Sequence, residues 1–212
     1  MKGTPVTVRA VSEVGPDTVA LELESPPNFD PLPGQFVLLR AVVDGAELAR
    51  HYTLSSPDAE GTFELTVGVD PEGDLSPWLA GLEAGDTVHV EGPMGVITYE
   101  GDADAVAVAG GPGIGPAIAV AESALEAGHT AAVVYRDETP VHRDRLRRLE
   151  DRGVPVTILG PGTGDKLADA IARHATDGEL FVFGFRSFVE DVREALAAAG
   201  VDPEAANIEN FG

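Results

Sequence analysis

The chain contains no cysteine among its 212 residues, and this absence excludes several kinds of site. A disulfide scaffold, a thiolate-ligated metal centre and an iron–sulfur cluster held in the usual way all require cysteine. The sequence also lacks a run of about eighteen apolar residues, the minimum for a membrane-spanning helix, and it lacks an apolar signal region at its start. We therefore expect a cytoplasmic protein without membrane insertion.

Positive charge is scarce as well. Lysine and arginine together number 14 against 36 aspartates and glutamates, which gives a net charge of −22, and Lys2 and Lys166 are the only lysines. A field of that sign repels nucleic acid phosphates and anionic lipids, so neither is an expected partner. The acids are scattered and 43% of the residues are hydrophobic, which favours a folded chain over a disordered one. An acidic, lysine-poor surface on a folded protein indicates adaptation to high salt, where the charges are screened.

The first hundred residues show the alternation of apolar and polar residues that is typical of β-strands. Clusters rich in glycine, proline, aspartate and asparagine separate the alternating segments. Several short strands at this spacing predict an antiparallel barrel or a sandwich. The expected strands are residues 6–11, 18–24, 35–43, 62–67 and 87–91.

After residue 101 the pattern changes to strands and helices that strictly alternate. Residues 105–109 form a short apolar run without alternation, which is typical of a buried parallel strand. The alternation of elements predicts βαβ units, with a parallel sheet covered by helices on both faces. We expect two domains, residues 1–100 and 101–212. The further expected strands are 130–135, 154–159 and 180–183, and the expected helices are 117–127, 142–151, 165–175 and 188–199.

Polar segments of the first half have residues suited to a phosphorylated aromatic ligand. Arg50 offers a cation for phosphate, Tyr52 offers a flat ring for stacking, and the hydroxyls that follow them can reach ring heteroatoms. Gly73 precedes Ser76, a potential N-cap, and Pro77 at the first helical position, so a helix start with free N–H groups is expected there. Taken alone, these segments also suit a solvated turn and an ordinary capped helix.

A tight turn, Gly92-Pro93-Met94-Gly95, comes next, and its ordinary alternative is a simple strand exit. The order Arg-x-Tyr-Thr-Leu-Ser-Ser, Gly-x-x-Ser, Gly-Pro-x-Gly resembles the ferredoxin–NADP reductase-like flavoproteins. That family includes flavin reductases, cytochrome b5 reductases and reductase components of oxygenases. The resemblance implies a Greek-key antiparallel β-barrel that holds FAD, followed by a Rossmann-like α/β domain that binds NAD or NADP.

The resemblance also implies roles for residues of the barrel. Arg50 would pair with the flavin pyrophosphate, Tyr52 would stack on the isoalloxazine ring, and Thr53 would hydrogen-bond near flavin N5, where hydride arrives. The backbone at 73–76 would hold the pyrophosphate, and the turn at 92–95 would let the chain pass close to the cofactor. The cofactor-binding residues implied for the barrel are Arg50, His51, Tyr52, Thr53, Leu54, Ser55, Gly73, Leu75, Ser76, Gly92, Pro93 and Gly95.

A glycine-rich loop directly follows the apolar strand at 105–109. Its glycines allow a tight turn and a close approach of the backbone to a pyrophosphate, with Pro116 opening the next helix. The general dinucleotide fingerprint has glycine or alanine where Pro116 stands, whereas the proline version resembles the nicotinamide-binding loop of the same family, Gly-Gly-Thr/Val-Gly-Ile-x-Pro. Pro112 departs from that pattern and removes a backbone donor. The implied contacts in this loop are Gly111, Gly113, Ile114 and Pro116.

The segment after the second strand of this half is where the adenosine ribose would lie. Asp137 and Glu138 would accept from ribose hydroxyls and repel a 2′-phosphate, which favours NAD. Arg136 and Arg143 favour NADP, and we expect NAD on balance. Five arginines in this region form either a solvated helix face or a docking patch for an acidic electron carrier. They are Arg143, Arg145, Arg147, Arg148 and Arg152.

Two segments near the end of the chain complete the expected site. Phe183 stands where the family strand has a cysteine beside the nicotinamide, Gly184 follows as a cofactor contact, and Phe185 replaces a proline. Glu209 and Phe211 resemble the acidic and aromatic residues that close over the family's flavin or nicotinamide pocket. The residues expected to act in catalysis are Tyr52, Thr53, Phe183, Glu209 and Phe211.

The expected function is transfer of hydride from NAD(P)H to FAD, and then of electrons to a separate acceptor. That acceptor is a ferredoxin-like protein, an oxygenase or free flavin, and any cluster or haem belongs to another chain because this one has no cysteine. The alternative, which the substitution at Phe183 keeps open, is a non-catalytic or relay flavin-binding subunit of a larger redox complex. The five histidines show no ligand spacing, and no metal site is expected.

Overall fold

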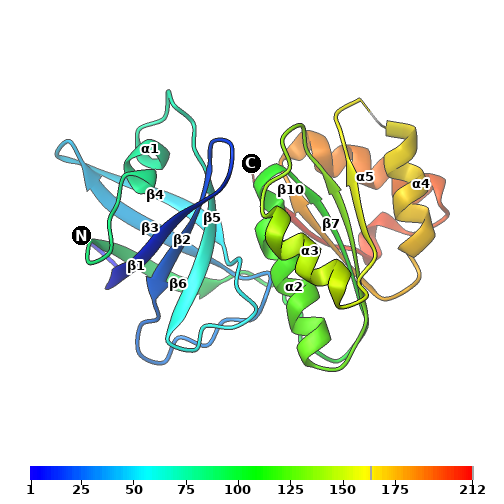
Figure 1. Cartoon of the computed structure of the whole chain (residues 1–212), viewed down its shortest axis with the longest axis horizontal. Coiled ribbons are helices and arrows are strands. Elements are labelled where there is room, and N and C mark those ends of the chain that lie inside the picture. Colours follow the sequence, from blue (N-terminus) through cyan, green and yellow to red (C-terminus); the bar gives the residue numbers. More distant parts are fainter. Residues whose placement is uncertain (163, 212) are drawn as a thin grey trace.

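Six antiparallel strands and a short helix occupy the first part of the chain in the computed structural model, which describes residues 1–162 and 164–211 (Figure 1). The strands are hydrogen-bonded in the order β4-β3-β6-β1-β2-β5. The two outer strands approach each other at an isolated bridge between Leu54 and Leu65, so the sheet closes into a barrel. The elements are β1 (Thr4–Gly15), β2 (Thr18–Glu24), β3 (Phe36–Val43), β4 (Ala46–Thr53), β5 (Thr62–Gly68), α1 (Leu75–Ala80) and β6 (Thr87–Met94).

The alternation in the sequence predicts the barrel core correctly where one face of a strand is buried. Leu21 and Leu23 on β2, and Phe63 and Leu65 on β5, are almost fully buried, while the polar residues between them are only partly covered. Burial of these apolar side chains is the main favourable term in closing the barrel.

Strand β4 was not among the expected strands. Asp44 and Gly45 both have positive φ, 49° and 83°, and form a tight hairpin turn that returns the chain along β3. The polar string that begins at Arg50 therefore ends strand β4 instead of following a strand.

A parallel five-stranded sheet forms the rest of the molecule, in the order β11-β10-β7-β8-β9. The helices α2 and α3 pack on one face and α4 and α5 on the other (Figure 1). Both faces of the central strand are covered, which explains its run of apolar residues without alternation. The elements are β7 (Ala105–Gly110), α2 (Ile114–Glu126), β8 (Ala131–Arg136), α3 (Arg143–Asp151), β9 (Val156–Leu159), α4 (Gly164–His174), β10 (Glu179–Gly184), α5 (Arg186–Ala198) and β11 (Asn207–Asn210).

The barrel followed by a parallel α/β sheet confirms the expected fold class. The differences are the two unexpected strands, β4 and β11, and the ends of several elements. A 3₁₀ turn, Gly111–Gly113, precedes α2, so Pro116 is the third residue of that helix and does not open it. Strand β11 was not expected and pairs in parallel with the edge of β10. Tyr99, in the connection between the two sheets, is buried against Phe181 with ring centroids 5.8 Å apart.

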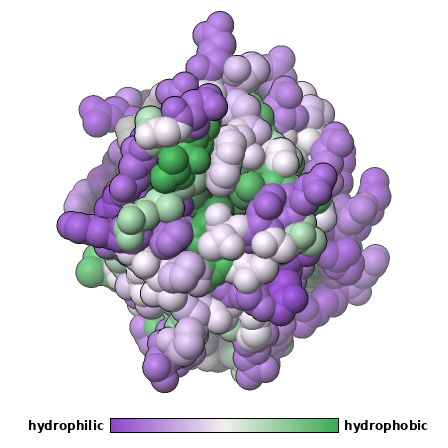
Figure 2. All heavy atoms as spheres, turned by 90° about the vertical axis from the view of Figure 1, so that its left-hand side faces the viewer, coloured by the Kyte–Doolittle hydropathy of each residue, from purple (hydrophilic) through white to green (hydrophobic). Residues whose placement is uncertain are grey.

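Hydrophilic side chains surround the barrel end that faces away from the α/β sheet, and hydrophobic residues show near the middle of this face (Figure 2). Within the described residues, no helix combines the length and the apolar character needed to cross a membrane.

Candidate functional site

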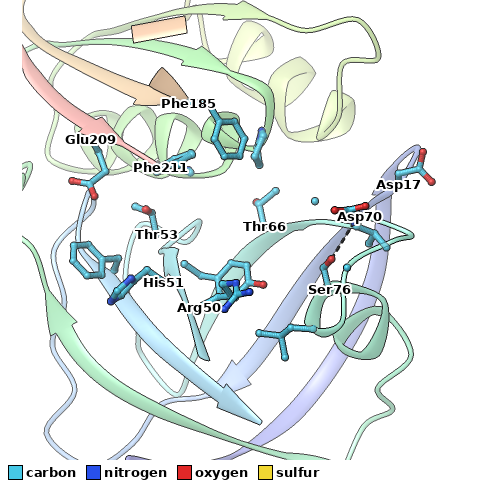
Figure 3. A pocket seen from close by; sticks show the side chains of 18 of the residues that line it. Asp17, Arg50, His51, Thr53, Thr66, Asp70, Ser76, Phe185, Glu209 and Phe211 are labelled. Carbon is cyan, nitrogen blue, oxygen red and sulfur yellow. Dashed lines mark hydrogen bonds between the residues drawn. The ribbon is translucent and has the colours of Figure 1, made fainter. Parts of the chain in front are cut away.

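A cavity of about 720 Å³ lies between the barrel and the α/β sheet (Figure 3). Its walls come from β4, β5 and the loop before α1 on the barrel side, and from the start of α2 and the last described residues on the other side. Ten of the predicted site residues line it: Arg50, His51, Tyr52, Thr53, Gly73, Leu75, Ser76, Pro116, Glu209 and Phe211.

The end of β4 forms the barrel wall of the cavity. His51 packs edge to face on Phe36, with ring centroids 5.2 Å apart. Arg50 donates from Nη1 to the carbonyl of Ala49 at 2.8 Å, and it forms no ion pair within the described part of the chain. Burial raises the pKa of Tyr52 to about 12 against the opposing effect of the Arg50 charge, so its phenol stays neutral at ordinary pH.

The loop before α1 forms a second part of the wall, and its hydrogen bonds differ from the expected ones. Ser76 lies inside α1, where its Oγ accepts from the backbone N–H of Asp70 at 3.0 Å, and it does not cap the helix. The N-cap position belongs to Asp74, whose side chain makes no capping bond. Together with Asp17, these aspartates bring negative charge to the cavity wall.

The prolines are the part of the glycine-rich loop that contacts the cavity. Pro112 and Pro116 line the cavity, whereas Gly111, Gly113 and Ile114 do not. A Cβ on Gly113 would lie 2.3 Å from the carbonyl oxygen of Phe183, so a glycine is needed there to pack the loop on β10.

The two phenylalanines at the end of β10 have different surroundings. Phe183 is fully buried and stacks beside Phe181, with centroids 6.4 Å apart, so its side chain does not reach the cavity. Phe185 is 52% exposed, lines the cavity and meets Phe211 edge to face (Figure 3). Gly184 between them lies under Phe188, whose ring a Cβ would meet at 2.6 Å.

Several predicted residues of the barrel lie behind the cavity wall. Leu54 and Ser55 are buried in the interior. The expected tight turn at 92–95 is wrong, because Gly92 and Pro93 belong to strand β6, which ends at Met94. Gly95 follows the strand and supports Phe36, because a Cβ on Gly95 would lie 3.0 Å from the Phe36 ring. These residues do not line the cavity.

The predicted ribose-binding residues also lie outside the cavity. The guanidinium of Arg136 stacks over the Phe188 ring at 4.9 Å and pairs with Asp191 at 2.7 Å. Asp137 accepts from the hydroxyl of Tyr135 at 3.0 Å and from the backbone N–H of Thr139 at 2.8 Å. Both residues stand at the carboxyl end of β8, beside the glycine-rich loop.

The five arginines of the predicted charge cluster do not act as one surface. Arg145 points to the barrel and pairs with Glu64 at 2.8 Å and with Glu122 at 2.6 Å. Arg147 is 69% exposed and pairs with Asp144 on its own helix. Arg145 is therefore a contact between the two sheets, which the sequence alone did not indicate.

Strand β11 contributes Glu209 and Asn210 to the cavity wall. Glu209 pairs in register with Phe183, and burial raises the pKa of its carboxyl group. Ten further residues line the cavity that were not among the cofactor-binding and catalytic residues expected from the sequence, and most of them are loop residues or belong to β5. They are Asp17, Phe36, Thr66, Gly68, Val69, Asp70, Asp74, Pro112, Phe185 and Asn210.

Known proteins with similar sequences include an oxidoreductase domain family and several reductase components. Residues 5–99 match the family model of the oxidoreductase FAD-binding domain. The ferredoxin reductase component of 3-ketosteroid-9-alpha-monooxygenase from Mycobacterium tuberculosis is 33% identical over 194 residues, which cover 84% of this chain and 54% of that protein. The corresponding component from Rhodococcus rhodochrous is 33% identical over 226 residues, covering 97% of this chain and 64% of that protein. The chain thus spans somewhat more than half the length of these relatives.

The same architecture occurs in solved structures. The FAD/NAD-binding domain of the nitric oxide dioxygenase from Vibrio cholerae superposes with a TM-score of 0.86 at 22% identity, covering 100% of both chains. The chain is therefore similar in sequence to reductase components with an oxidoreductase FAD-binding domain, and it shares the ferredoxin–NADP reductase-like fold.

Proposed function

We propose that this chain is an FAD-containing reductase that takes hydride from NADH or NADPH and passes electrons to a separate acceptor protein. Arg50 is the observation that carries the proposal. In a chain with 36 acidic residues, it reaches a cavity of about 720 Å³ and pairs with no carboxylate among the described residues. A guanidinium in this position is suited to a diphosphate, which it binds with two parallel hydrogen bonds.

The residues around the cavity fit FAD. Tyr52 and Phe211 offer aromatic surface, Thr53 offers a hydroxyl and Arg50 offers a charge, all on one cavity. Bound FAD would accept hydride from the nicotinamide and release electrons to the acceptor. The raised pKa of Glu209 lets this carboxyl group hold a proton beside the cavity more readily than an exposed glutamate does.

In this proposal the two domains divide the binding work. Residues 1–100 hold FAD and residues 101–212 hold the nicotinamide nucleotide, whose phosphates lie against the start of α2. Phe183 supports Gly113 from the interior, and Phe185 stands on the cavity side, where the nicotinamide ring would enter.

The surroundings of Arg136 support NADH as the preferred donor. Its guanidinium is already engaged by Asp191 and by the Phe188 ring, and the Arg136 side chain is only 18% exposed. A 2′-phosphate at the end of β8 would therefore meet the carboxylate of Asp137, and Arg136 is not free to offset that charge. Like-charge repulsion of this kind discriminates against the phosphorylated nucleotide.

The relatives indicate the class of acceptor. The relatives from Mycobacterium tuberculosis and Rhodococcus rhodochrous are named as ferredoxin reductase components of a monooxygenase. By this similarity, the acceptor is a ferredoxin-like protein or an oxygenase. The alternative is a relay subunit that binds flavin without accepting hydride, and it is supported by the Phe185–Phe211 pair, which covers the α/β side of the cavity.

Anaerobic mixing of the FAD-loaded protein with NADH or NADPH tests the proposal. We expect rapid bleaching of the flavin absorption band, and faster bleaching with NADH. Absence of bleaching with both nucleotides would favour the relay subunit. A purified protein that takes up no FAD would overturn both functions.

Adaptation to high salt and location in the cytoplasm remain predictions. The net charge of −22 supports the first, because screening removes the self-repulsion of the folded state. A thermal unfolding temperature that rises steeply with KCl concentration is the expected result, and an unchanged temperature would contradict it.

A further inference from the structure

A chain of buried hydroxyl and imidazole groups crosses the boundary between the barrel and the α/β sheet. Ser55 is 0% exposed, Thr66 is 7% exposed and His142 is 4% exposed, and they are the buried polar residues of the described part of the chain. The Oγ of Ser55 lies 2.7 Å from Oγ1 of Thr66. The same Oγ1 lies 2.8 Å from Nε2 of His142, which precedes α3 in the other domain. Buried polar groups of this kind are kept where their partners satisfy them.

Helix α2 begins directly on this pair of hydroxyls. A Cβ on Gly115 would lie 2.3 Å from Oγ1 of Thr66 and 2.4 Å from Oγ of Ser55, so the glycine lets the helix approach to contact distance. The next residue of the helix, Pro116, lines the cavity, and so does Thr66. The hydroxyl pair therefore lies at the point where the two walls of the cavity meet.

Arg145 lies beside the hydroxyl chain, where the barrel meets the α/β sheet. Its guanidinium donates to Glu64 on β5 at 2.8 Å, to Glu122 on α2 at 2.6 Å and to the carbonyl of Ser55 at 2.8 Å. The side chain is 13% exposed. One residue of α3 thus ties α2 and the barrel together beside the hydroxyl chain.

We propose that His142 is a positioning residue that acts through Thr66 and Ser55. It holds the start of α2 against β5. The distance between the barrel wall of the cavity and the wall formed by Pro112 and Pro116 therefore stays constant. If the domains moved apart, Thr66 and His142 would lose the hydrogen bond between them, whereas Ser55 and Thr66 would stay together on the barrel. The loss of that buried hydrogen bond favours the closed arrangement. Burial and the nearby Arg145 charge also lower the pKa of His142, which keeps the imidazole neutral and available to hydrogen-bond at neutral pH.

Measurement of the distance between the two domains tests the proposal and does not require the enzyme reaction to proceed. The chain has no cysteine, so cysteines introduced at the exposed Glu60 of the barrel and Glu150 of α3 are unique sites for spin labels. In the FAD-loaded full chain we expect a single narrow distance distribution. Thr66→Val, which keeps the shape and removes the hydroxyl, and His142→Leu should broaden or shift it.

Conservative and matched variants separate this role from a general loss of folding. Thr66→Ser and His142→Gln keep a hydrogen-bonding group and should restore the narrow distribution. Thr62→Val makes the same substitution on the same strand, away from the hydroxyl chain, and should behave as the parent protein. Ser55→Ala provides a second break in the chain if Thr66→Val does not fold. A broad distribution in the parent protein, or a narrow and unshifted one in Thr66→Val and His142→Leu, would overturn the proposal.

Flavin reduction provides the second measurement, which rests on the proposed function. Misplacement by about 1 Å lowers transfer rates by up to roughly 100-fold, so we expect Thr66→Val and His142→Leu to lower the limiting rate about tenfold or more. The dissociation constant of FAD should change far less, and Thr66→Ser should recover the rate. Lower thermal stability with an unchanged limiting rate would assign His142 a purely structural role and overturn the positioning role. If neither nucleotide reduces the flavin of the parent protein, the proposed function fails, and the distance distributions still decide the role of His142.

Discussion

Phe185 and Phe211 meet edge to face beside the cavity, with ring centroids 5.8 Å apart and ring planes at 90° (Figure 3). The contact depends on strand β11, because its parallel pairing with β10 brings the end of the chain to the cavity. The backbone N–H of Phe211 then donates to the carbonyl of Gly184 at 3.0 Å. Two aromatic rings from segments far apart in the sequence thus form one side of the proposed flavin and nicotinamide site.

Replacement of Phe211 by alanine should weaken FAD binding by up to about tenfold, because one aromatic contact contributes about 0.5–1.5 kcal/mol beyond its buried area. A titration that follows quenching of flavin fluorescence measures this. Phe29→Leu is the control, since Phe29 packs on Phe63 in the barrel and does not line the cavity. Equal affinity of Phe211→Ala and the parent protein would place the flavin away from this ring.

Replacement of Arg50 by alanine should raise the dissociation constant of FAD by about 10- to 100-fold, because a hydrogen bond to a charged group contributes about 1.5–3 kcal/mol. Arg50→Lys keeps the charge but cannot form the two parallel hydrogen bonds, so its dissociation constant for FAD should lie between those of the parent protein and Arg50→Ala. Arg9→Ala removes an exposed arginine that pairs with Glu24 on the barrel surface and should leave the affinity unchanged. The same titration decides the matter, and an Arg50→Ala protein with parent-like affinity would contradict the assignment.

Replacement of Gly115 by alanine should destabilise the protein, although alanine is normally favoured over glycine inside a helix by about 1 kcal/mol. The added Cβ would lie 2.3 Å from Thr66 Oγ1, and overpacking of this kind costs about 1–3 kcal/mol. Urea unfolding measures the change in the free energy of unfolding. Gly68→Ala on β5, where a Cβ has no atom within 4 Å, is the control. A gain in stability for Gly115→Ala would show that α2 does not rest on the hydroxyls.

Stability should fall as pH drops from about 6.5 toward 3, and His142 should account for part of the loss. Burial, with the Arg145 charge as a smaller cause, lowers the pKa of His142 to about 3, while the unfolded chain protonates this imidazole near 6.5. The stabilisation is therefore complete above about pH 6.5 and decreases below it by up to about 1.4 kcal/mol per pH unit.

Urea unfolding of the parent protein and of His142→Gln across this range isolates the effect from that of the many carboxylates. The advantage of the parent over His142→Gln should shrink as pH falls below 6.5. A difference that stays constant with pH would show that His142 is not buried in neutral form.

Replacement of Asp191 by asparagine should shift the nucleotide preference toward NADPH. The change frees Arg136 from its 2.7 Å ion pair, so the guanidinium becomes available to a 2′-phosphate. We expect the ratio of NADPH to NADH affinity to rise about fivefold to tenfold, which corresponds to about 1–1.4 kcal/mol. Calorimetric binding of both nucleotides measures the ratio. Adding Arg136→Ala to Asp191→Asn should abolish the shift, and its persistence in the double variant would exclude Arg136 as the cause.

The elements that the sequence predicts best are those whose burial is uniform along their length. The residues of β5 alternate between polar and apolar because one face of the strand packs in the barrel, although Thr66 on the other face is buried as well. Strand β7 is apolar throughout because helices cover both of its faces. Strand β4 escaped prediction because its residues are all at least partly exposed and show no period. Strand β11 escaped because it has only four residues at the edge of the sheet.

Some site residues could also be predicted from the sequence, and others could not. Local chemistry singled out Arg50 and Tyr52, and both line the cavity. The sequence placed Phe183 at the reacting centre, but the two-residue period of β10 turns Phe183 inward, with Phe181, and leaves Phe185 beyond the strand end. No local pattern links Ser55 and Thr66 to His142, because their contact depends on the packing of the α/β sheet and its helices on the barrel.

The sequence by itself determined the order and type of most elements and the residues able to hold a diphosphate, since these depend on local periodicity and on side-chain chemistry. The tertiary structure alone decided which of those residues share a cavity and which support its walls from behind. The physical reason is that burial and hydrogen-bond partners are set by neighbours from distant segments, as when Gly115 of α2 comes to rest on the hydroxyls of Ser55 and Thr66.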